Sequence, residues 1–200
     1  MVAVALAVCY LVGSVPSAFL LVRGLKGIDI RTIGSGNVGA TNALRATGVG
    51  VGVIVLLVDG LKGVLAVSLI ASWLLEDPTP PARLLCGVAA VIGHAFPVFL
   101  RFRGGKGVAT TIGVLLAAMP GIAAAGLAVW LVVFLIWRYV SVGSMVFATM
   151  IPVFQLLAHQ ALAQVLAGAA LALLIVLRHQ SNIGRLLQGT EERLSFRREG

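Results

Sequence analysis

The sequence has few charged residues, few aromatic residues and only two cysteines. Charged residues make up 11% of its 200 positions, whereas a soluble domain averages about 25%. This shortage excludes an ordinary soluble domain. The 60% hydrophobic content and the mean hydropathy of +1.06 indicate an all-α integral membrane protein, and the length favours a single membrane domain over residues 1–200.

The scarcity of cysteine and of carboxylates also limits the kinds of site. Cys9 and Cys86 both lie in apolar runs, which favours small packing residues over a disulfide. His, Cys and acidic residues show no metal-ligand spacing, so no metal or other cofactor is predicted. The net charge of +8 lies mainly on short connectors, which indicates orientation in a bilayer rather than binding of nucleic acid. No obligate protein partner is predicted.

About seven transmembrane helices are predicted, with five as the alternative count. The apolar runs are Val2–Val22, Val49–Leu75, Leu84–Leu100, Val108–Met119, Gly121–Trp137, Val142–Leu157 and Ala161–Leu177. Pro16 is expected to bend the first run. Four short crossings fit between Lys106 and Arg178, because about 70 residues of helix extend about 105 Å, too far for two crossings of about 30 Å. The run Val108–Met119 is too short to cross alone and is expected to be tilted, kinked or partly re-entrant.

With seven spans, the loops on one side of the membrane carry 13 of the 15 lysines and arginines. The positive-inside tendency makes that side cytoplasmic. The N-terminus is therefore expected outside the cell and the C-terminus inside. The three most polar stretches of the chain would share the cytoplasmic side.

The first polar stretch, residues 33–45, combines glycines with hydroxyl, amide and guanidinium groups. Its candidate site residues are Gly34, Ser35, Gly36, Asn37, Gly39, Thr41, Asn42 and Arg45. The three glycines permit positive φ and a nest of N–H groups that suits an anion. Ser35 or Asn37 is expected to cap a short helix over Ala40–Ala46, from which Arg45 would reach back toward the nest. The alternative is a plain glycine-rich connection between two helices.

The second polar stretch ends in Gly104-Gly105-Lys106, which resembles a phosphate cradle with lysine as a point charge. It is not a Walker A loop, because Leu100 and Gly107 stand at two positions that the pattern fixes. The alternative is a basic loop that snorkels to lipid headgroups. His94, inside the preceding span, is typical of a hydrogen-bonding residue in helix packing.

The third polar stretch, residues 178–191, contains His179 and Asn182 at i and i+3, so one helical face could offer both to a substrate. The alternative is a basic tail attracted to anionic lipid. Two further sets of polar residues lie in or beside spans. They are the i, i+3 pair Asp59 and Lys62, interpreted as a structural lock or else a substrate contact, and Ser141 and Ser144, which could bind a ligand or cap a helix.

Together the three stretches resemble, in order and over essentially the whole chain, the three motifs of the bacterial acyl-phosphate:glycerol-3-phosphate acyltransferases. The resemblance implies a multi-pass enzyme of the bacterial inner membrane with a cytoplasmic active site. Such an enzyme carries out the first step of phospholipid synthesis, in which acyl phosphate and glycerol 3-phosphate give 1-acyl-glycerol 3-phosphate (lysophosphatidic acid) and phosphate. It also implies that Ser35 and Arg45 serve activity and that the loop from Gly104 to Lys106 binds glycerol 3-phosphate. His179 and Asn182 would line the site, and Glu191 would support the fold. Gln180 stands where the family is expected to have arginine, and Gly107 where alanine is common.

Two questions stay open at this level. A small membrane transporter of a phosphorylated solute is the alternative function, because it also needs broken helices and cations at an anion site, although no internal repeat supports it. In the enzyme, the general base is either His179 or a phosphate oxygen of the substrate. Ser35 is expected to hydrogen-bond the reacting centre, since no acidic third member completes a triad.

Overall fold

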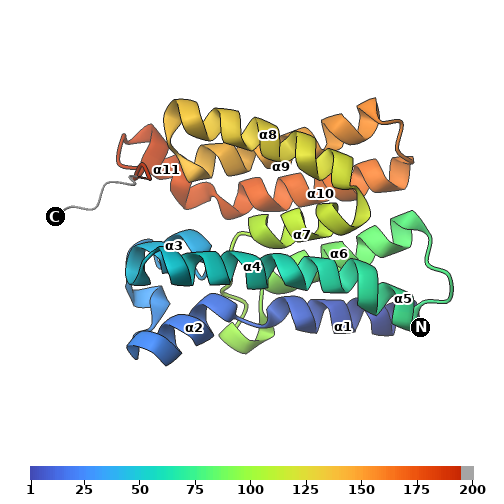
Figure 1. Cartoon of the computed structure of the whole chain (residues 1–200), viewed down its shortest axis with the longest axis horizontal. Coiled ribbons are helices and arrows are strands. Elements are labelled where there is room, and N and C mark those ends of the chain that lie inside the picture. Colours follow the sequence, from blue (N-terminus) through green and yellow to red (C-terminus); the bar gives the residue numbers. More distant parts are fainter. Residues whose placement is uncertain (195–200) are drawn as a thin grey trace. The chain divides into compact units, whose positions relative to one another are not determined.

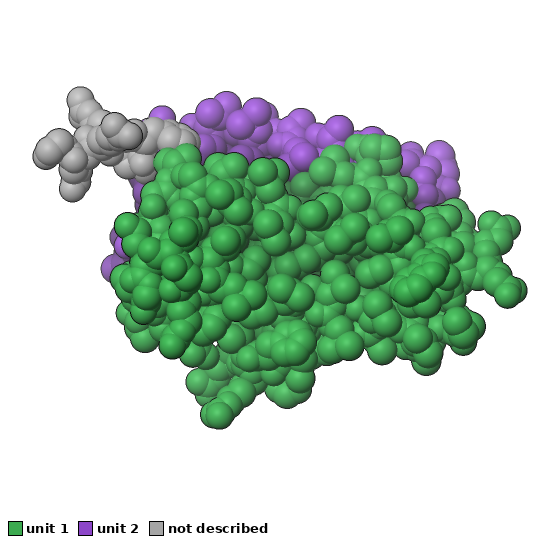
Figure 2. Space-filling view, turned by 60° about the horizontal axis from the view of Figure 1, so that its bottom comes forward, with its two compact units in different colours: residues 1–120 green, residues 121–200 purple. Residues whose placement is uncertain are grey.

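The computed structural model describes residues 1–194, and these residues form helices joined by short loops, with no strand among them. The chain divides into two compact units, Met1–Pro120 and Gly121–Gly200, which are coloured separately in Figure 2. The all-α fold predicted from composition is therefore confirmed.

The first unit is built from seven α-helices and three short helical turns (Figure 1). Its α-helices are α1 (Val2–Ser14), α2 (Ser17–Lys26), α3 (Ala40–Thr47), α4 (Val49–Leu65), α5 (Ala71–Leu74), α6 (Pro80–Ala95) and α7 (Val108–Ala118). The short turns are η1 (Ile30–Thr32), the π-helical η2 (Ala66–Ile70) and η3 (Val98–Leu100). Proline and glycine set several boundaries: Pro80 begins α6, and Gly27 ends α2 with φ of 69°.

The first predicted span is broken at Val15 and Pro16, as the proline indicated. At the break, the Val15 carbonyl accepts the Ser17 N–H over 3.0 Å instead of a helical donor. Lys62 Nζ, from α4, also donates to that carbonyl oxygen over 2.5 Å. A cation inside the bundle thus adds a second donor to a backbone group at the break.

Close helix contacts in this unit depend on glycine. A Cβ at Gly13 of α1 would overlap the Ala90 carbonyl of α6, and a Cβ at Gly113 of α7 would overlap the Gly60 carbonyl of α4. Small residues let helices approach where lipid supplies no hydrophobic drive for association. These contacts hold α1 against α6 and α4 against α7.

The second unit contains α8 (Pro120–Trp137, beginning at the boundary residue), α9 (Val140–Leu157), α10 (Leu162–Arg178) and α11 (Gln180–Leu187). Helices α8 and α9 pack through Gly126 against Phe147 and through Gly143 against Trp130. Helices α10 and α11 meet at His179 with a bend of 54°.

All seven predicted apolar runs are helical in the structure. Five segments are long and apolar enough to span a membrane: Val2–Lys26, Val49–Leu74, Pro80–Leu100, Pro120–Trp137 and Val140–Leu157. The bent pair α10–α11 makes a sixth if it counts as one span. The seventh run is α7, whose 11 residues match the prediction that this segment is too short to cross alone.

Candidate active site

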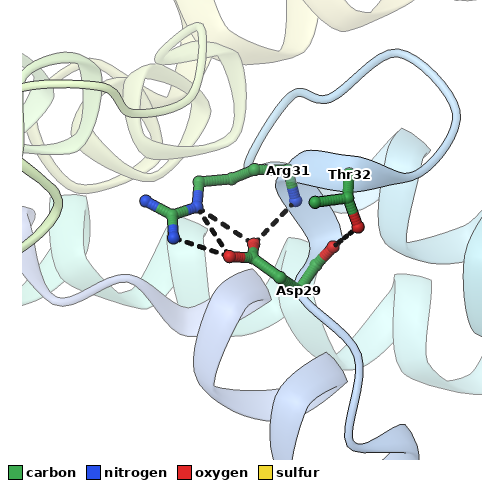
Figure 3. Close-up of polar contacts among 3 residues, drawn as sticks. All are labelled: Asp29, Arg31 and Thr32. Carbon is green, nitrogen blue, oxygen red and sulfur yellow. Dashed lines mark hydrogen bonds and ion pairs between the residues drawn. The ribbon is translucent and has the colours of Figure 1, made fainter.

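The loop between α2 and α3, residues 27–39 and here called the first loop, is anchored by Asp29 (Figure 3). The Asp29 carboxylate accepts hydrogen bonds from the Arg31 backbone N–H at 3.0 Å and from the Arg31 guanidinium at 2.6 to 3.1 Å. The Thr32 hydroxyl donates to the Asp29 carbonyl over 2.8 Å. The bonds from the Arg31 side chain and backbone lower the pKa of Asp29 to about 2, so the fork is charged at neutral pH.

The glycines of the first loop do not all have the predicted role. Gly34 and Gly36 have φ of 55° and 67°, in the region that favours glycine, as a nest requires. Gly39 has φ of −157°, which is extended backbone, so it does not use the positive φ that glycine permits. Ser35 is exposed between the two left-handed glycines, and its N–H is already bonded to the side chain of Asn42 on α3.

Asn42, from the first turn of α3, organises the first loop from inside. Its side chain is buried, and its Oδ1 accepts from the Ser35 N–H over 3.1 Å. Its Nδ2 lies 3.0 Å from the carbonyls of Ile33 and Asn37 and 3.2 Å from that of Ile30. An amide with this many partners on the loop supports its shape rather than offering free groups to a ligand.

The predicted helix over Ala40–Ala46 is present as α3, but the predicted cap was wrong. Gly39 is the N-cap residue, and no side chain caps the helix, so neither Ser35 nor Asn37 does so. The backbone carbonyl of Asn37 instead accepts a hydrogen bond from Asn42 Nδ2. The first N–H groups of α3 therefore have no side-chain acceptor, which suits an anion at this end. Arg45 is exposed on the same helix, and Thr41 is half-buried one turn before it.

The glycines of the second loop, residues 101–107, pack against the end of α6. The N–H of Gly104 donates to the Ala95 carbonyl over 3.3 Å, and that of Gly105 donates to the His94 carbonyl over 3.1 Å. Both backbone donors are thus used inside the protein, so the predicted N–H cradle at these two glycines was wrong. The glycines are needed for space, because a Cβ on either would overlap His94 atoms. Lys106 is half-buried beside them, just before α7 begins.

The predicted pairing of Asp59 with Lys62 is confirmed. Lys62 Nζ lies 2.5 Å from Asp59 Oδ1, and both residues are buried. The Ser17 hydroxyl donates to the same oxygen over 2.5 Å, and His94 Nδ1 lies 3.5 Å from it. The sequence reasoning missed Ser17, although a serine directly after the helix-breaking Pro16 faces the carbonyl that the break exposes. It also missed Asp29, whose signal was its position two residues before Arg31.

In the second unit, His179 lies at the bend between α10 and α11, and it is 2% exposed. Its Nδ1 is 2.7 Å from the Ile175 carbonyl oxygen. Because a carbonyl only accepts, Nδ1 carries a proton, so Nε2 is the nitrogen that can accept a proton when the ring is neutral. Asn182 follows in the first turn of α11, and its N–H donates to the His179 carbonyl over 2.9 Å. His179 is the cap residue of α11, and the bend falls at this residue, so the offer of both side chains to one substrate stays a prediction.

The Glu191 carboxylate accepts hydrogen bonds from three side chains of the second unit. Its Oε1 accepts from Asn182 Nδ2 at 2.5 Å and from the Ser141 hydroxyl at 2.6 Å, and its Oε2 accepts from Arg185 Nε at 2.7 Å. Burial raises the pKa of Glu191, but the three donors outweigh burial and hold it below its usual value. Glu191 thereby ties α11 to the start of α9. The Ser144 hydroxyl donates to the Val140 carbonyl of its own helix over 2.8 Å.

Comparison with known proteins identifies the family. The family model described as glycerol-3-phosphate acyltransferase matches residues 3–189. The glycerol-3-phosphate acyltransferase of Desulforudis audaxviator (strain MP104C) is 47% identical over 189 residues, covering 94% of this chain and 93% of the relative. That of Shouchella clausii (strain KSM-K16) is 44% identical, covering 92% of each chain.

Two solved structures of PlsY, an integral membrane glycerol 3-phosphate acyltransferase, share the fold. The glycerol 3-phosphate form has a TM-score of 0.88 and 39% identity, covering 97% of this chain and 96% of PlsY. The lysophosphatidic acid form has a TM-score of 0.85 and 38% identity, covering 97% and 95%. The family resemblance, the integral membrane fold and the acyltransferase class predicted from the three motifs are thus confirmed. The chain belongs to the glycerol-3-phosphate acyltransferase family.

Proposed function

We propose that this enzyme transfers an acyl group from acyl phosphate to the 1-hydroxyl of glycerol 3-phosphate. The products are 1-acyl-glycerol 3-phosphate and inorganic phosphate. The observation that carries the proposal is the similarity, over 97% of the chain, to PlsY in a glycerol 3-phosphate form and a lysophosphatidic acid form. The same similarity disfavours the transporter alternative.

The donor is inferred from what the described residues offer. Residues 1–194 consist of short loops and helices, with no soluble domain that could embrace a nucleotide or a carrier protein. An acyl phosphate needs only a small anion site at the membrane surface, with its chain left in the bilayer. It is a mixed anhydride and already activated, so positioning of the reactants supplies much of the catalysis.

Arg45 and Lys106 are the proposed phosphate-binding cations. Arg45 is exposed on α3, the helix after the first loop; the left-handed glycines of that loop and the uncapped start of α3 favour an anion. Lys106 extends from a backbone that His94 and Ala95 hold in place. Two phosphates in one site repel each other, and these cations offset that charge. Ser35 is proposed to hydrogen-bond the reacting centre.

His179 and Asn182 are proposed to act on the acceptor. The 1-hydroxyl oxygen attacks the acyl carbon, and the bond from that carbon to the phosphate oxygen breaks. His179 Nε2 suits the role of proton acceptor, since Nδ1 is committed to the Ile175 carbonyl. A phosphate oxygen of the substrate is the competing base. Asn182 donates its Nδ2 to Glu191, which fixes the orientation of the amide that is proposed to contact the acceptor.

The proposed location is the bacterial inner membrane, with the N-terminus outside and the C-terminus and the reaction on the cytoplasmic side. The support is the distribution of lysine and arginine over the loops. The reaction is tested with purified protein, palmitoyl phosphate and labelled glycerol 3-phosphate. One phosphate released per acylated product is expected. Phosphate release without acylated glycerol 3-phosphate would contradict the proposal.

A further inference from the structure

A buried polar network in the first unit lies outside the residues assigned to the reaction. Asp59 and Lys62 of α4, Ser17 of α2 and His94 of α6 make it up, and each is at most 8% exposed. The Asp59 Oδ1 atom accepts from the Lys62 ammonium and the Ser17 hydroxyl, both at 2.5 Å. Asp59 is thereby held from two sides and its charge is balanced by Lys62.

His94 connects this network to the second loop. One edge of its ring places Nδ1 3.5 Å from Asp59 Oδ1. The other edge faces Gly105, since a Cβ on Gly105 would overlap both Nε2 and Cε1 of the ring. The His94 carbonyl also accepts the Gly105 N–H over 3.1 Å. His94 therefore touches Gly105 with its ring and with its backbone.

Gly105 is itself enclosed by the first loop. A Cβ added there would come within 2.8 Å of the Val38 carbonyl as well as overlapping the His94 ring. Gly105 therefore lies between the imidazole and the Val38 carbonyl, and a side chain at this position would clash with both. Any turn of the ring would push on Gly105 and the neighbouring Lys106.

Packing alone does not fix the ring. A cavity beside it is lined by Ser14, Ser17, Val38, Asp59, His94 and Gly105, among others. The Ser14 hydroxyl is fully buried there and has no partner among the described residues. The ring borders only a small cavity on this side, and the contact with Asp59 helps to set its orientation.

We infer that Asp59 is a positioning residue that acts through His94. By fixing the imidazole, Asp59 holds the backbone of Gly105 and Lys106 in the position in which Lys106 binds the phosphate of glycerol 3-phosphate. The inference rests on the proposed function of Lys106. It predicts a selective effect on the acceptor, because none of these residues is assigned to the acyl donor.

The test compares three variants in purified enzyme. His94→Phe keeps a ring but removes both nitrogens, and Asp59→Leu/Lys62→Met removes the carboxylate and its acceptor oxygens without leaving a buried charge unpaired. The third combines all three substitutions. Either change alone should raise the KM for glycerol 3-phosphate about tenfold, which corresponds to about 1.4 kcal/mol of acceptor binding. The KM for acyl phosphate should stay within about twofold, and the combination should raise the first KM no further.

A matched control is Arg83→Met, at the other end of α6, where the guanidinium bonds the Pro78 and Val67 carbonyls. It should lower the unfolding temperature and leave both KM values unchanged. Acceptor binding is also followed as the rise in unfolding temperature with glycerol 3-phosphate, so that a poorly active variant still gives a result.

The outcomes separate the inference from the proposed function. If Lys106→Met raises the KM for glycerol 3-phosphate but His94→Phe does not, the inference fails alone. Additive effects in the combined variant would show that Asp59 does not act through His94. If Lys106→Met itself leaves that KM unchanged, both the proposed role of Lys106 and the inference are overturned.

Discussion

The side-chain amide of Asn42 should be required for the conformation of the first loop. The cost of replacing Asn42 can be worked out from its hydrogen bonds. Asn42→Ala removes one acceptor, used by the Ser35 N–H, and two N–H donors shared among three carbonyls. Three net hydrogen bonds at about 1 kcal/mol each amount to about 3 kcal/mol. That corresponds to about a hundredfold change in the population of the ordered loop.

The loss should appear mainly in kcat/KM for glycerol 3-phosphate, because Ser35 lies in the loop that Asn42 shapes and Arg45 lies on the helix that follows it. Asn42→Asp should be at least as harmful, since a carboxylate oxygen would then face the carbonyls of Ile33 and Asn37. Kinetics and thermal unfolding of purified enzyme measure both effects. Thr47→Ala, on the same helix, removes one hydroxyl bond to the Ala43 carbonyl and should cost no more than about 1 kcal/mol. Wild-type kinetics in Asn42→Ala would refute the assignment of the loop's shape to this side chain.

Three further predictions concern charge, pH and orientation. Arg45→Lys keeps the charge but loses the planar fork, so it should lose at least about tenfold in kcat/KM; near-normal kinetics would remove Arg45 from the site. Because donors hold the folded pKa of Glu191 below its usual 4.5, its stabilisation is complete above about pH 4.5 and is lost as the pH falls through the folded value. The unfolding temperature should therefore drop in acid, and Glu191→Gln should flatten that drop while lowering stability at pH 7; an unchanged acid profile in the Gln variant would exclude Glu191 as the cause. Single cysteines at Ser35, Lys106 and Asn182, in a chain without Cys9 and Cys86, should react with an impermeant thiol reagent from the cytoplasmic side only, and labelling of any one from outside would contradict the proposed orientation.

The sequence predicted the helices well because each apolar run is long enough to be recognised without knowing its neighbours. The run Val108–Met119 and the break at Pro16 were also predictable, since length and proline act locally. The α10–α11 bend at His179 was not, because no proline or glycine marks it. Periodicity alone then placed His179 and Asn182 on one face.

The loops were harder to predict, because glycine serves two purposes that a sequence does not distinguish. Gly34 and Gly36 adopt positive φ, whereas Gly104 and Gly105 are needed for close approach to His94 and use their N–H groups within the protein. The difference lies in which backbone atoms face each glycine, and that depends on tertiary packing. Asn42 illustrates the same limit, since its partners lie 5 to 12 residues away along the chain.

The identity of the donor is the most direct test of the account. Purified enzyme is given labelled glycerol 3-phosphate with either palmitoyl phosphate or palmitoyl-coenzyme A, in parallel and at equal concentration. Arg45 and Lys106 are the proposed phosphate-binding groups, and residues 1–194 contain no separate domain that could hold the nucleotide of the thioester. The account predicts labelled 1-acyl-glycerol 3-phosphate with the acyl phosphate and none above background with the thioester. Robust turnover with palmitoyl-coenzyme A and none with palmitoyl phosphate would contradict it.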